Sequence, residues 1–157
     1  MIVNCVSAMP NTVWSGPSRL ADASAPTIVI QSVQVRSIVN RLIDCYSAII
    51  EGMINKLELE NKIYENPTAP MLKVKIVKEH FNDPTLNEYL EFYIFLRQLY
   101  LAEYRASGEF RKNVTMTSTM NGKEIEIKID TVTEYYMKTK EFLHFIQRFI
   151  EEKEKNE

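Results

Sequence analysis

Basic and aromatic side chains gather in one stretch of the chain, and these residue types have the clearest capacity for binding chemistry. The stretch contains Arg97, Tyr100, Tyr104, Arg105, Arg111 and Lys112. Arginine and lysine contact phosphates, and tyrosine rings provide surfaces on which bases stack. We therefore take Arg97, Tyr104, Arg105, Arg111 and Lys112 as candidate nucleotide- or RNA-binding residues. The alternative is that cations near the end of a helix stabilise its dipole and keep the surface soluble.

The chain offers little to the other common kinds of site. A zinc site needs about four cysteine or histidine ligands, or three and an open position. This chain has two of each residue, none closely paired, so we predict neither a metal site nor a cofactor. We find no metalloprotease motif, no nucleophile elbow and no glycine-rich phosphate loop. Glu88 and Glu91 share a helix face that we expect to meet solvent, so we name no catalytic residue.

Composition is typical of a soluble globular domain. The 157 residues are 45% hydrophobic and 25% charged, with a formal net charge of −2, so no overall positive field attracts nucleic acid or anionic membranes. No run approaches the roughly 20 apolar residues of a membrane span. Two cysteines are too few for a disulfide scaffold, and Cys45 lies in an apolar helical pattern. We expect Cys45 to act as a small buried hydrophobe and the protein to be cytoplasmic.

The first part of the chain differs from the rest. Residues 1–26 carry three prolines, one glycine, several small residues and little charge, without any period. We predict that residues 1–26 form a disordered or loosely packed leader. Residues 27–157 then form a single helical-bundle domain.

Apolar residues at helical spacing predict four helices, over about 30–63, 69–80, 83–106 and 132–152. Asn66-Pro67 is expected to end the first helix, and Asp83 followed by Pro84 to begin the third. The spacing of a capping box, Thr131 to Glu134, predicts the start of the last. The third helix is apolar over much of its surface, which indicates burial on two sides, in the bundle core and in a dimer interface.

Before the last helix the period changes from helical to alternating. Methionine and serine alternate with threonine up to Met120, and isoleucine alternates with charged residues after Gly122. Asn121-Gly122 between them favours a type I′ turn, because both central residues need positive φ. The sequence therefore predicts a mainly α fold, an up-and-down helical bundle with a short β-hairpin inserted before the last helix.

This layout resembles small HEPN-like proteins, of which archaea have several families. The resemblance covers about residues 30–152 and rests on long antiparallel helices, an aromatic third helix, the arginine-containing turn after it, and a last helix that reads EYYMKTKEF from Glu134 to Phe142. It implies a helical bundle that homodimerises. In this family many members are RNases, and inactive members accompany a nucleotidyltransferase chain.

The RNase members of that family pair an arginine with a histidine that follows after four to six intervening residues. Arg111 matches the arginine, but Met116, Thr117 and Ser118 occupy the positions where the histidine would fall. Without an imidazole, acid–base chemistry near neutral pH lacks its usual agent. We therefore expect a non-catalytic HEPN-like protein that homodimerises and binds a partner protein or a nucleotide. Two alternatives stay open: a HEPN-type protein that binds or cleaves RNA through the basic and aromatic residues, and a structural bundle unrelated to HEPN.

Overall fold

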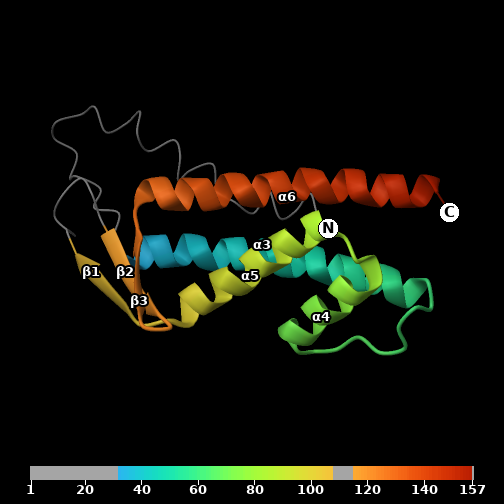
Figure 1. The fold of residues 1–157 in the computed structure, drawn as a ribbon, viewed down its shortest axis with the longest axis horizontal. Helices are drawn as coiled ribbons and strands as arrows, with labels where there is room; N and C mark the ends of the chain where they lie inside the picture. The colour runs from blue at the N-terminus through green and yellow to red at the C-terminus, as the bar shows by residue number, and fades with distance from the viewer. Residues whose placement is uncertain (1–31, 108–114, 157) are drawn as a thin grey trace.

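A computed structural model describes residues 32–107 and 115–156. The described chain is mainly helical, with a small antiparallel sheet before the last helix (Figure 1). Its elements are α3 (Ser32–Leu59), α4 (Pro70–Phe81), α5 (Pro84–Leu101), β1 (Tyr104–Ser107), β2 (Thr115–Met120), β3 (Lys123–Ile127) and α6 (Ile129–Lys155). The predicted leader, residues 1–26, lies outside the described residues. The three long helices alternate in direction, since α3 and α6 run away from the sheet and α5 runs toward it.

The helix α3 ends several residues before the proline that was expected to end it. Asn61 adopts the left-handed conformation, with φ of 55°. The backbone N–H of Lys62 donates to the carbonyl of Leu57 at 2.9 Å, and that of Asn61 donates to Glu58 at 3.0 Å. This pair of bonds is a Schellman motif, which satisfies the last carbonyls of the helix. The prediction of a helix to about residue 63 is therefore corrected to Leu59.

The start of α5 follows the sequence prediction, and its end does not. The carboxylate of Asp83 accepts from the backbone N–H of Leu86 at 2.8 Å, and Pro84 takes the first helical position. The helix stops at Leu101 rather than near residue 106. The residues that follow form strand β1, which pairs with β2 in antiparallel register, Tyr104 opposite Ser118. The tertiary pairing with β2 overrides the helical pattern read from the local sequence.

The predicted hairpin is confirmed and belongs to a three-stranded sheet of order β1-β2-β3. Asn121 and Gly122 have φ of 51° and 76°, as a type I′ turn requires. The inward face of the sheet packs on the helices through Met116, Ser118 and Ile127, which are all buried. Packing on the helices supplies the support that an isolated hairpin lacks in water.

The last helix begins earlier than predicted. The helix α6 starts at Ile129, so Thr131 is inside its first turn rather than before it. The Thr131 hydroxyl accepts from the backbone N–H of Lys128 at 3.3 Å. The threonine therefore does help to cap the helix, but from the third helical position, and the predicted capping box with Glu134 is wrong.

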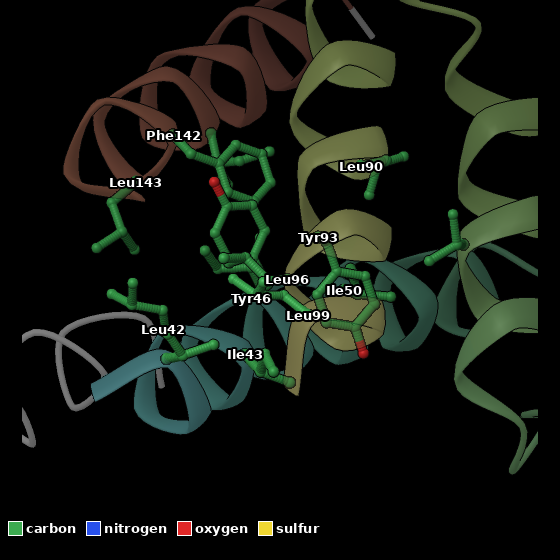
Figure 2. Close-up of a cluster of buried hydrophobic side chains, with 14 of the residues drawn as sticks. Leu42, Ile43, Tyr46, Ile50, Leu90, Tyr93, Leu96, Leu99, Phe142 and Leu143 are labelled. Carbon is green, nitrogen blue, oxygen red and sulfur yellow. The ribbon is translucent and has the colours of Figure 1, made fainter. Parts of the chain in front are cut away.

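The core is built around α3, which contacts α4, α5 and α6. Aromatic rings from three helices meet at its centre (Figure 2). Phe142 of α6 stacks on Tyr46 of α3 with ring centroids 4.8 Å apart, and on Tyr89 of α5 at 4.7 Å. Cys45 is buried as predicted, but it is not a free thiol, so the expectation of a simple small hydrophobe in a reducing compartment gains no support. Within the described residues, no helix combines the length and apolar character needed to cross a bilayer.

Candidate functional site

Arg97 lies where α5 packs on α3, and its guanidinium is held by an aromatic ring. The Arg97 guanidinium carbon is 5.7 Å from the centroid of the Tyr93 ring, and its Nη1 is 3.4 Å from the Tyr93 hydroxyl. That hydroxyl is 3.0 Å from the Ser47 Oγ of α3. Arg97 is therefore half-buried at the α3–α5 interface, one turn beyond the buried tyrosine that positions it.

Tyr104 and Arg105 are in strand β1, not on the third helix as the sequence predicted. Successive side chains of a strand point to opposite faces. Tyr104 is half-buried and Arg105 is exposed, which fits this alternation. Arg97 and Arg105, which the predicted helix over about 83–106 contains together, therefore lie on different elements. Arg111 and Lys112 lie outside the described residues.

Sequence reasoning missed Arg36, which contacts both tyrosines of the predicted patch. Its guanidinium carbon is 4.8 Å from the centroid of the Tyr100 ring and 4.9 Å from that of Tyr104. Its Nη2 donates to the backbone carbonyl of Tyr100 at 3.0 Å. Cation–π contacts of this kind contribute about 0.5–1 kcal/mol each at exposed sites. Arg36 thus covers part of the ring surface that the sequence offered for base stacking. The two partners lie more than 60 residues away in the chain, so no local signal could reveal the contact.

The side of α5 that faces α6 carries mainly acidic rather than basic side chains. There a pocket of about 490 Å³ lies between α5 and α6. Glu88 and Tyr89 of α5 and Glu134, Met137, Lys138 and Glu141 of α6 line it. The three carboxylates outnumber the one ammonium group. The α6 residues recur at positions 134, 137, 138 and 141, a helical spacing that places them on one face and could have been read from the sequence.

The carboxylates of the pocket influence the tyrosine beside them. Burial raises the pKa of Tyr89, and the negative charges of Glu141 and Glu88 raise it further, while Arg148 acts in the opposite direction. A phenolate is disfavoured there because it would be partly removed from water and placed near two carboxylates. Glu141 and Glu88 therefore place negative charge near Tyr89.

The glutamates of the pocket differ from others on the same helices. In the described part of the chain, Glu88, Glu134 and Glu141 make no ion pair within 4.0 Å, whereas Glu91, one turn along α5, pairs with Lys78. Lys138 uses an aromatic ring instead, its Nζ lying 4.7 Å from the centroid of Phe92. Among residues 32–107 and 115–156, the pocket's three carboxylates thus have no ion-pair partner, and its one ammonium group lies on a ring.

The described residues contain no group of three or more histidine, cysteine or acidic side chains that could hold a metal ion. His80 is exposed, and its Nδ1 is 2.9 Å from the carbonyl of Ile76 in its own helix. Comparison with family models, with curated proteins and with solved structures finds no match to this chain.

Proposed function

We propose that this chain is a non-catalytic, HEPN-like helical protein that homodimerises and binds a partner protein or a nucleotide. The observation that carries the proposal is the position of strand β2. The residues that replace the family's histidine lie in this strand, where Met116 is 2% exposed and Ser118 is fully buried. The Ser118 hydroxyl donates to the carbonyl of Glu103 at 3.3 Å. Side chains at these two positions face the core, so this segment does not offer them to a substrate.

The resemblance also supplies the proposed partners. A nucleotidyltransferase-type chain would accompany an inactive HEPN-like protein, and the two chains would then bind the nucleotide together. An archaeal source and a cytoplasmic location belong to the same proposal. The partner chain and the archaeal source follow from the family pattern in the sequence, and the cytoplasmic location is inferred from the small number of cysteines.

Self-association is the part of the proposal that is easiest to test. The end of α5 carries Leu101, which is 75% exposed. A second copy that packs on α5 would remove this apolar surface from water. We therefore expect the full chain, of 18.3 kDa, to have the mass of a dimer in light scattering.

A matched pair of variants distinguishes a dimer formed through α5 from nonspecific association of exposed apolar residues. Leu101→Glu should shift the mass toward the monomer, because a carboxylate would be buried without a partner in the interface. Leu59→Glu, at the end of α3, alters a leucine that is 84% exposed and should leave the dimer intact. A monomeric wild-type chain would contradict the proposal. It would favour a bundle unrelated to HEPN, in which α5 is covered by elements of its own chain.

RNA binding is the second candidate, and the position of Arg36 favours it. This arginine places a cation beside Tyr104 at the start of the sheet, and Arg105 is exposed on the other face of the same strand. Binding through such a surface would weaken steeply with salt. Arg105→Ala and Arg111→Ala should each reduce the affinity for single-stranded RNA, whereas Arg41→Ala on the exposed face of α3 should not. Absence of binding at low salt would contradict this function.

A further inference from the structure

The turn between β2 and β3 places an asparagine directly before a glycine at the surface. Asn121 and Gly122 are both exposed, and their φ values of 51° and 76° are both positive. The antiparallel ladder ends at the pair Met120 and Lys123, so the peptide bond between Asn121 and Gly122 lies outside it. Apart from the chain neighbours of Gly122, no heavy atom of the described residues comes within 4 Å of the position that a Cβ there would take. The turn therefore has open space on its glycine side.

An asparagine before a glycine is chemically less stable than other asparagines. The glycine nitrogen attacks Cγ of the asparagine, which forms an N–Cγ bond, breaks the Cγ–Nδ2 bond and releases ammonia that takes up the proton of the attacking nitrogen. The product is a five-membered succinimide. One water molecule opens this ring, at Cγ to leave aspartate or at the backbone carbonyl carbon to leave isoaspartate. Glycine favours the ring closure because it has no Cβ to obstruct the attack.

Two other asparagines provide an internal comparison. Among residues 32–107 and 115–156, Asn61 and Asn82 also have positive φ, and both are exposed. Lysine and aspartate follow them in the chain, whereas Asn121 is followed by the only glycine that comes directly after an asparagine in this sequence. The nitrogen after Asn61 is also engaged, because the Lys62 N–H donates to the Leu57 carbonyl. The three asparagines thus share backbone region and exposure and differ in the nucleophile beside them.

We propose that Asn121 is a site of spontaneous deamidation and isomerisation in the native chain, with Gly122 as the source of the attacking nitrogen and water as the source of the new oxygen. The reaction requires neither the dimer nor the nucleotide of the proposed function. Its test therefore gives a result whether or not that function is correct.

The isoaspartate product alters the hairpin as well as its charge. The main chain then runs through the former side chain, which adds one carbon atom to the backbone of a two-residue turn. The register that pairs Met120 with Lys123 depends on the length of that turn. The buried Ile127 ends the same strand, and α6 begins at Ile129. We therefore expect isoaspartate at position 121 to loosen the packing of the hairpin on the helices.

The first experiment follows the folded full chain during incubation at mildly alkaline pH in water enriched in oxygen-18. Tryptic digestion in ordinary water and tandem mass spectrometry then locate each labelled carboxylate, so deamidation during digestion is not counted. Asn121 should convert at least about tenfold faster than Asn61 and Asn82, because a Cβ on the following residue obstructs ring closure in those two. Chromatographic separation of the peptides distinguishes isoaspartate from aspartate.

Two variants separate the reaction from its consequences. Asn121→Gly keeps a residue pair that favours a type I′ turn but removes the side-chain amide, so it should not gain the acidic species that the wild type gains on ion exchange. Freshly prepared Asn121→Asp carries the charge of the product without the added backbone atom and should melt close to the wild type. The isoaspartate fraction of aged wild type should melt lower than Asn121→Asp by about 2 °C or more.

Several results would overturn the proposal. Equal conversion of Asn121, Asn61 and Asn82 would remove the role of the glycine. Conversion of Asn121 in the urea-unfolded chain but not in the folded chain would show that the native turn protects it. Acidic species that form as fast in Asn121→Gly as in the wild type would place the reaction elsewhere. An isoaspartate fraction that melts with Asn121→Asp would overturn the expected effect on the hairpin.

Discussion

The helix α5 contributes aromatic rings to two interfaces whose charges are opposite. On the side of α3, the rings of Tyr93 and Tyr100 contact the guanidinium groups of Arg97 and Arg36. On the side of α6, the ring of Tyr89 borders a pocket with three glutamates. The arginines are held by π faces and hydrogen bonds, whereas the pocket glutamates make no ion pair within 4.0 Å among the described residues.

This difference shows that aromatic content alone does not define the use of a surface. At the α3–α5 interface the charged groups are already engaged inside the chain, so they stabilise the fold. At the α5–α6 interface, Glu88, Glu134 and Glu141 make no ion pair with any residue in the described part of the chain. The two sides of α5 therefore differ in how far their charged groups are engaged by the fold.

The largest expected effect is at the point where the two interfaces meet. Phe142 is fully buried and stacks on Tyr46 of α3 and Tyr89 of α5. Phe142→Ala should lower the free energy of unfolding by about 3–5 kcal/mol, because it removes a large core side chain and leaves a cavity. Urea unfolding measures the change, and His144→Ala, two residues along on the exposed face, is the control. A loss below about 1 kcal/mol would mean that α6 is not packed on the other helices as described.

A smaller effect is expected at the α3–α5 interface. Arg36→Ala removes two cation–π contacts and the hydrogen bond to the Tyr100 carbonyl, so the free energy of unfolding should fall by about 2 kcal/mol. Arg41→Ala, on the exposed face of the same helix, should change it by less than about 0.5 kcal/mol. Equal effects of the two substitutions in urea unfolding would show that Arg36 is as solvated as Arg41, and the contrast between the interfaces would be lost.

The features predicted correctly from the sequence are those with strong local signals. The apolar stripe of α3, the Asp83-Pro84 start of α5 and the Asn121-Gly122 turn depend on near neighbours in the chain, and the structure confirms each. The error at the end of α5 has a tertiary origin, whereas those at the end of α3 and the start of α6 concern local capping. Strand β1 exists because it pairs with β2, and the position of Tyr104 follows from that pairing. No local pattern encodes it.

The candidate site was predicted less well than the fold. Tyr104 and Arg97 were selected for their residue type, but their surroundings are set by Arg36 and Tyr93, which only the packing of α3 on α5 brings close. Glu88 was predicted to meet solvent on a helix surface, and none of the pocket glutamates was selected as a site residue. A ligand site depends on which charges remain unpaired after packing, and a sequence does not show this.

The smallest expected effect tests the electrostatics of the α5–α6 pocket directly. Burial, Glu141 and Glu88 raise the pKa of Tyr89, so the folded chain resists forming the phenolate more than the unfolded chain does. A group with a raised pKa contributes its stability below the unfolded value, near 10 for tyrosine, and that stability is lost as the pH rises through the folded pKa.

Comparing the phenolate absorbance of the wild type and Tyr89→Phe isolates this titration. Glu141→Gln should move the pKa of Tyr89 back toward its ordinary value, while Glu91→Gln, whose carboxylate is paired with Lys78, should move it less. Equal shifts from the two variants would mean that the pocket does not concentrate negative charge around Tyr89, and the contrast between the two sides of α5 would reduce to a difference in packing.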